Sequence, residues 1–143
     1  MIALRALLIA ACLAAASWVS GAQERPRDGV VVIGNPNVPH TDVSTIQRLY
    51  TGRAIVVDGV PVVVVNLAPG EPLRERFMAN VMREDDEKYI AYWTVRKYVG
   101  KGAPPREFRS VAEVIAFVQS TAGAVGYIGA SDLKPGMNVV TRP

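Results

Sequence analysis

The chain has 143 residues, and its 16 Lys and Arg against 13 Asp and Glu give a formal net charge of +3 at pH 7. These charges are too balanced, and too scattered along the sequence, to indicate a nucleic-acid partner. The single cysteine, Cys12, excludes a framework of intramolecular disulfides, and the single histidine, His40, has no cluster of metal-ligating residues around it. The sequence therefore predicts neither a metal site nor a cofactor.

Residues 1–22 have the pattern of a secretory signal peptide, with one basic residue, an apolar run from Ala6 to Val19 and small residues before a cleavage point after Ala22. The run is shorter than the about 20 residues that a transmembrane helix needs. Cleavage leaves 15 of the 16 basic residues against 13 acidic ones, and residues 23–143 as one periplasmic domain. A lipoprotein signal ending at Cys12 is a second interpretation, which leaves an apolar segment on the mature protein.

The first predicted elements after this segment are a strand and a helix. Val30 to Ile33 is an unbroken β-branched run, which is typical of a strand buried on both faces of a sheet. Two prolines between residues 35 and 39 end that strand. Thr41 or Asp42 then caps a helix with one apolar face, which ends at Gly52.

A hairpin follows, because Asp58-Gly59 separates two apolar runs, Ile55 to Val57 and Val60 to Val65. Pro61 cannot donate to a ladder, so it places the start of the second strand at an edge or a bulge.

Two further helices are predicted from residue 69 onward. Pro72 is suited to the first turn of one, and the apolar stripe of that helix is Leu73, Phe77, Met78, Val81 and Met82. Asp85 starts the next, whose apolar side is formed by Tyr89, Tyr92, Trp93 and Val99.

The last part of the chain is predicted to contain a loop, a helix and two strands. Gly100 to Arg109 has the composition of a loop, and Ser110 with Glu113 forms a capping box at the start of a fourth helix. Val125 to Ile128 and Met137 to Val140 are the last strands. Strands that alternate with helices predict an α/β layer structure.

Five short segments occur in a fixed order along the chain. They are Leu49-Tyr50-Thr51-Gly52-Arg53, Leu73-Arg74-Glu75-Arg76-Phe77, Tyr92-Trp93, Gly100-Lys101-Gly102-Ala103-Pro104-Pro105 and Gly123-Ala124-Val125-Gly126-Tyr127. In this order they resemble the substrate-binding proteins of phosphate ABC transporters, in the periplasmic-binding-protein-like group. The resemblance implies a single three-layer α/β lobe of a type II periplasmic binding protein, with a mixed sheet flanked by about four helices. A full protein of that kind has two lobes, and this chain has the length of one.

The resemblance also implies where an anion binds. In that family a loop at a helix start cradles phosphate, and Gly70 lies at the corresponding place here. The flanking Pro69 and Pro72 remove N–H donors and Glu71 adds negative charge, whereas Arg74, one turn on, offsets that charge or is a solvated surface residue.

Three more candidate ligand donors follow the first strand. Asn35, Asn37 and Ser44 come after its carboxyl end, the end at which open α/β sheets bind ligands. The alternative is that they shape turns and caps. The predicted ligand-binding set is therefore Asn35, Asn37, Ser44, Gly70 and Arg74.

Two functions follow from these residues and the resemblance. The first is an exported solute-binding-like protein that binds phosphate or another small anion and works with an inner-membrane transporter. The second is a non-catalytic periplasmic accessory protein that has lost ligand binding and docks on another envelope protein. A homodimer through the hairpin edge is a variant of both. No enzyme is predicted, because His40, Asp42 and Ser44 form a turn and a cap rather than a triad.

Overall fold

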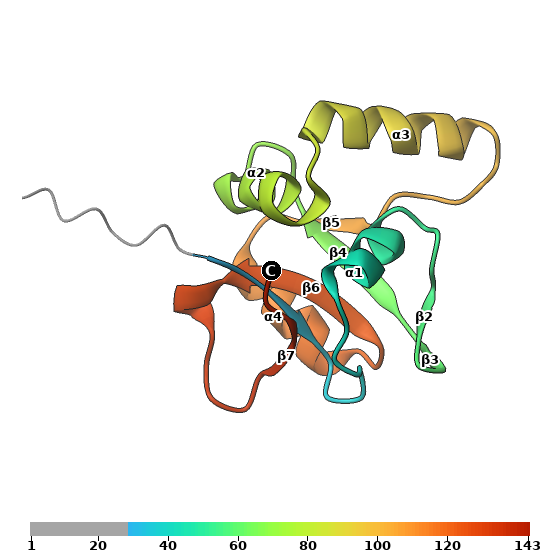
Figure 1. Cartoon of the computed structure of the whole chain (residues 1–143). Coiled ribbons are helices and arrows are strands. Elements are labelled where there is room, and N and C mark those ends of the chain that lie inside the picture. The colour runs from blue at the N-terminus through green and yellow to red at the C-terminus, as the bar shows by residue number, and fades with distance from the viewer. Residues whose placement is uncertain (1–28) are drawn as a thin grey trace, which may run out of the picture.

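Five strands form one mixed sheet in the order β5-β4-β6-β1-β7 (Figure 1). The computed structural model describes residues 29–143, so the signal-peptide prediction for residues 1–22 and the alternative at Cys12 lie outside it. The strands are β1 (Val30–Gly34), β4 (Val63–Leu67), β5 (Arg106–Phe108), β6 (Ala124–Gly129) and β7 (Asn138–Thr141).

The direction of β1 determines which loops lie together at one end of the strands. β4 runs parallel to β5 and β6, whereas β1 runs antiparallel to both of its neighbours, β6 and β7. Every residue of β1 is buried, which confirms the predicted strand at Val30 to Ile33. Because β1 is reversed, its carboxyl end lies beside the amino end of β6, where Gly34 pairs with Val125.

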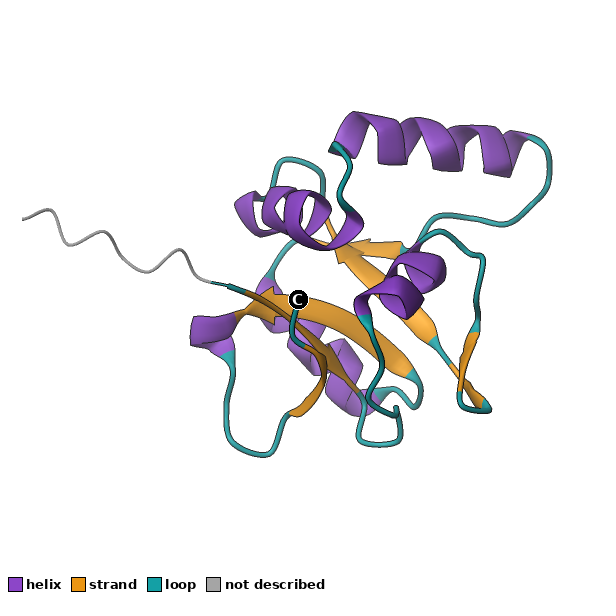
Figure 2. Ribbon diagram, viewed as in Figure 1, coloured by secondary structure: helices purple, strands orange, loops and turns teal. Residues whose placement is uncertain are grey.

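Helices cover both faces of the sheet (Figure 2), which confirms the predicted three-layer lobe. One face packs against α4 (Val111–Ser120), where Gly126 leaves room for Val114. On the other face Phe77 stacks on Tyr127 with ring centroids 3.9 Å apart. The helices of this second face are α1 (Val43–Tyr50), α2 (Pro72–Phe77), the π-helix η1 (Met78–Met82) and α3 (Asp86–Tyr98); a 3-10 turn, η2 (Ala130–Asp132), follows β6.

Local signals position the helix starts as the sequence predicts. The Asp42 side chain caps α1 by accepting from the Thr45 N–H, and this backbone hydrogen bond lowers the pKa of the Asp42 carboxyl. Asp85 caps α3 in the same way, and Ser110 with Glu113 forms the reciprocal capping box of α4.

The hairpin is shorter than predicted. Its strands are β2 (Val56–Val57) and β3 (Val60–Pro61), joined by Asp58 and Gly59 with φ of 45° and 82°. The predicted strand Val60 to Val65 is therefore wrong as one element: the chain leaves the hairpin at Val62, and β4 begins at Val63, whose N–H donates to the Gly123 carbonyl of the large sheet.

Two other predictions are corrected. The predicted loop from Gly100 to Arg109 contains β5, which exists because its three residues pair with β4, and no sequence pattern marks them. Val99 is 55% exposed, because α3 ends at Tyr98 before the apolar side reaches it. Among residues 29–143, no helix is both long and apolar enough to span a bilayer.

Candidate functional site

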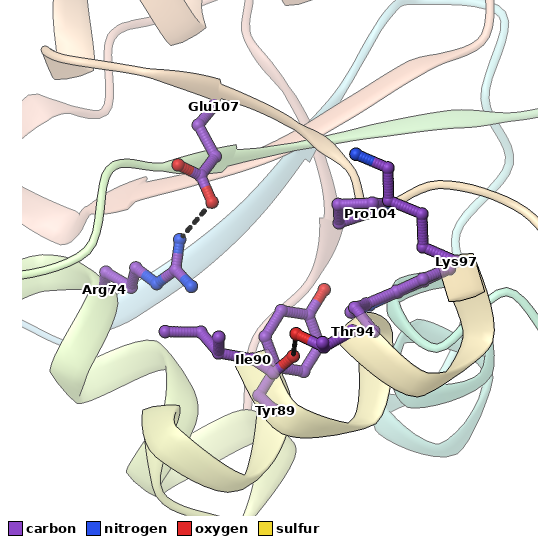
Figure 3. Close-up of a pocket in the computed structure, with 8 residues that line it drawn as sticks. Arg74, Tyr89, Ile90, Thr94, Lys97, Pro104 and Glu107 are labelled. Atoms are coloured by element: carbon purple, nitrogen blue, oxygen red, sulfur yellow. Dashed lines mark hydrogen bonds and ion pairs between the residues drawn. The ribbon is translucent and has the colours of Figure 1, made fainter.

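The buried guanidinium of Arg74 holds together the carboxyl ends of β4 and β5. Its side chain is 1% exposed, and Nη1 donates to the Leu67 carbonyl oxygen at 2.7 Å and to Glu107 Oε1 at 3.0 Å. Asp86 Oδ1 accepts from Nε at 2.9 Å and lies 2.7 Å from Nη2. Figure 3 shows Arg74 and Glu107 facing each other at one end of a cavity.

These contacts bear on both interpretations of Arg74, the solvated surface charge and the ligand-binding residue. Burial alone lowers the pKa of the guanidinium, but the hydrogen bonds that it donates to Asp86 and Glu107 outweigh burial and raise the pKa, so the group stays charged. The prediction of a solvated surface charge is wrong. Four of the five N–H donors of the group already have protein acceptors. Arg74 therefore links the carboxyl ends of β4 and β5 to α3, and only one of its N–H donors is left for a ligand.

The loop at Gly70 presents few donors to an anion. Pro69 and Pro72 have no N–H, and the N–H of Glu71 donates to the Ala68 carbonyl at 3.2 Å. The Glu71 side chain makes no capping bond, so its carboxylate stands at the start of α2, a helix of only six residues. Three backbone positions of the loop that corresponds to the family's cradle, Pro69, Glu71 and Pro72, therefore offer no free N–H to an oxyanion.

Asn35 and Asn37 lie at the opposite end of the strands from Gly70 and Arg74. The Asn35 amide donates to the Val118 carbonyl at 3.1 Å, and Asn37 Oδ1 accepts from the Gly123 N–H at 2.9 Å. Both residues do follow the carboxyl end of β1, but β1 is antiparallel to β6. The predicted donors therefore gather at the amino ends of β4 and β6, and both side chains bind the backbone.

Ser44 lies in a third place, a polar basin between α1 and α3. The basin has a volume of about 360 Å³ and is lined by Ser44, Gln47, Arg48, Thr51, Arg53, Met82, Glu84 and Tyr92. Within residues 29–143 neither Arg48 nor Arg53 forms an ion pair with a carboxylate. Arg53 stacks on the Tyr92 ring at 5.9 Å, and Glu84 supplies the one acidic side chain of the lining. The five predicted site residues are thus divided among three places.

Aromatic side chains of α3, which forms one wall of this basin, donate hydrogen bonds to the end of α1. The Tyr50 carbonyl oxygen accepts from Tyr89 Oη at 2.8 Å and from Trp93 Nε1 at 3.1 Å. The Thr51 carbonyl accepts from Tyr92 Oη at 2.8 Å. These side chains satisfy carbonyls that a helix end leaves without intrahelical partners. They hold α3 beside α1, and so fix the shape of the basin.

We expect Tyr89→Phe and Trp93→Phe each to lower the free energy of unfolding by about 1 kcal/mol, because each leaves the Tyr50 carbonyl one donor. In the double variant, the loss in the free energy of unfolding should exceed the sum of the two single losses by about 1 kcal/mol, because the buried Tyr50 carbonyl oxygen then has no donor. Urea denaturation of the four proteins measures this coupling. Tyr92→Phe, which acts on a different carbonyl, is the control and should add to Tyr89→Phe without coupling.

Sequence reasoning missed the buried polar group beside Arg74. Asn66, 1% exposed in β4, accepts through Oδ1 from the Tyr127 hydroxyl and from the Leu67 N–H. Burial raises the pKa of Tyr127, so its hydroxyl stays protonated and donates. An asparagine inside the apolar run from Val62 to Leu67 was the signal, because a buried amide requires partners.

Comparison with known proteins supplies the class of the fold. No family model and no curated protein matched the sequence. Three solved structures are similar to the chain: a protein from Clostridium perfringens described as a phosphate ABC transporter substrate-binding protein with bound phosphate (TM-score 0.62, 21% identity), an ABC-type phosphate transport receptor from Vibrio cholerae (0.55, 14%), and PstS from Borrelia burgdorferi (0.54, 14%). Each match covers 80% of this chain and 44%, 46% and 47%, respectively, of the other chain.

The layers and the strand order therefore define a fold of the periplasmic-binding-protein class. Within that class, the chain shares its fold with the substrate-binding proteins of phosphate ABC transporters, which confirms at the level of the fold the resemblance seen in the sequence. The chain spans less than half the length of each of these three proteins.

Proposed function

We propose that this chain is a solute-binding-like protein of the periplasm that holds a small anion, such as phosphate or a small carboxylate, in the basin between α1 and α3. In this proposal residues 1–22 direct export and residues 23–143 form the binding domain. An inner-membrane transporter is the partner that receives the anion. The shared fold supports the class of function, since two of the three similar proteins are described by phosphate transport or binding.

The observation that carries the choice of site is a pair of arginines, Arg48 and Arg53, that form no ion pair within residues 29–143. Arg48 and Arg53 line the basin together with Ser44, whereas the hydroxyl of Thr51, also in the lining, donates to the Gln47 carbonyl at 2.8 Å. A cation about 4 Å from an anion contributes about 4 kcal/mol at an effective dielectric near 20. The carboxylate of Glu84 repels an anion in the basin and so offsets the attraction of one arginine. The second arginine then leaves a net attraction for one anionic group. The Gly70 loop, by contrast, combines a carboxylate with two prolines.

Isothermal titration calorimetry with phosphate, sulfate and succinate tests this proposal. We expect at least one anion to bind the wild-type protein, and Arg48→Gln or Arg53→Gln to weaken it about ten-fold or more, because each removes a charge-assisted hydrogen bond. Lys134→Gln, in the loop before β7, is the charge-matched control and should bind as the wild type does.

Two outcomes contradict the proposal. Absence of heat with every anion, while circular dichroism shows a folded protein, would rule out solute binding. Full affinity in both arginine variants would place the anion outside the basin.

The second candidate function, a non-catalytic accessory protein, is favoured by a specific observation. Ile55, Val56 and Val63 are exposed by 70%, 43% and 47% near the hairpin. A cluster of this kind is typical of a protein-binding surface. A homodimer through this edge belongs to the same candidate, and light scattering of the purified protein measures it.

A further inference from the structure

An apolar groove runs along the base of α3 toward the hairpin. It consists of two cavities, of about 220 and 230 Å³, that share Trp93 and Pro104 in their walls. The first lies between α3, α2 and β5 (Figure 3). The second lies between the end of α1, the amino end of β4 and the loop at residues 103–106. Trp93 and Pro104 therefore form a wall that the two neighbouring hollows share.

The walls of both hollows expose apolar side chains. Ile90 is 42% exposed in the first, and Ile55 and Val63 are 70% and 47% exposed in the second. Pro104 and Pro105 give the second wall a rigid backbone with no N–H donors. Such apolar surface in contact with water favours a partner that covers it.

The charged residues that line the groove are mostly basic. They are Arg74, Lys97 and Arg106, together with one acidic residue, Glu107. Lys97 lines the first hollow and forms no ion pair within residues 29–143, whereas Arg106 stacks on Phe108 and Phe117. The one carboxylate in the lining, Glu107, is paired with Arg74. The rim therefore attracts negative charge.

We propose that this groove binds an extended polypeptide segment that carries two apolar side chains flanked by aspartate or glutamate. In an extended chain alternate side chains point to the same side, about 7 Å apart, so one short segment presents two apolar side chains to two neighbouring hollows. An acidic neighbour then meets Lys97. This site is separate from the anion basin and does not depend on anion binding.

Fluorescence polarisation with labelled ten-residue peptides tests the groove. The probe is a peptide pool with leucine or phenylalanine at positions 4 and 6, and with aspartate and glutamate elsewhere; a second pool has lysine instead of the acids. We expect the acidic pool to bind with a Kd below about 100 μM and the basic pool to bind about ten-fold more weakly or not at all. Ile55→Asp should abolish binding of the acidic pool, and Lys97→Glu should weaken it by about ten-fold.

Val95→Asp is the matched control, since Val95 is 62% exposed on α3 but lines neither hollow. It should bind the acidic pool as the wild type does, and circular dichroism should show both aspartate variants folded. Three results would overturn the proposal: no binding of any acidic peptide, equal loss in Ile55→Asp and Val95→Asp, or a homodimer that Ile55→Asp dissociates. Binding to anionic phospholipid vesicles that Val95→Asp abolishes, without peptide binding, would show a lipid surface instead.

Discussion

Replacing Arg74 with methionine is expected to lower the free energy of unfolding by about 3 kcal/mol. Removing one partner from a buried ion pair costs about 3–5 kcal/mol, because the remaining charges are left buried and unpaired. The lower end applies here, since the Asp86 and Glu107 side chains are 21% and 41% exposed and retain some water. The Leu67 carbonyl also loses its donor. Urea denaturation followed by circular dichroism measures the change.

Two companion variants separate the ion pairs from simple loss of packing. Arg74→Lys keeps a positive charge but cannot reach all three acceptors in the planar geometry of a guanidinium, so it should lose more than half of the same stability. Combining Arg74→Met with Asp86→Asn and Glu107→Gln should cost less than the sum of the separate changes, because no charge is then left unpaired. Strict additivity would show that the charges do not interact as the structure indicates.

Local features of the fold were predictable because their causes lie within a few residues. Asp42, Asp85 and Ser110 each accept from an N–H three residues on, so a short pattern contains both partners. The Asp58-Gly59 turn is also local, since its positive φ values belong to those two residues. The α/β class followed from the alternation of such elements, and the order of short segments carried the resemblance to a family.

The candidate site was less predictable because its geometry depends on long-range pairing. Arg74 looked like a surface residue of a short helix, and its partners lie 12 and 33 residues further along the chain. Asn35 was predicted to bind ligand because ligands bind at the carboxyl ends of parallel strands. β1 pairs antiparallel to β6, so its carboxyl end lies at the amino end of β6. Arg48 and Arg53 face Glu84 and Tyr92 in the basin only because aromatic donors dock α3 on α1.

Gly123→Ala is the second substitution with a large expected effect, because this glycine joins the large sheet to the hairpin. Its φ is +75°, and a β-carbon there would lie 2.2 Å from the Pro61 carbonyl oxygen. Its carbonyl accepts from the Val63 N–H at 2.9 Å and its N–H donates to Asn37 at 2.9 Å, so a displacement breaks both bonds. We expect a loss of about 3 kcal/mol or more, the sum of left-handed strain and the broken contacts.

Gly136→Ala is the matched control for this prediction. Gly136 has a similar φ of +88°, but no atom lies within 4 Å of the added carbon, so only the left-handed strain of about 1–2 kcal/mol applies. Thermal unfolding should therefore show a Tm lowered by about 10 °C or more for Gly123→Ala and by about 4–8 °C for Gly136→Ala. Equal shifts would mean that the hairpin yields freely at Pro61. The apolar wall formed by Ile55 and Val63 would then be a mobile surface rather than a fixed side of the groove.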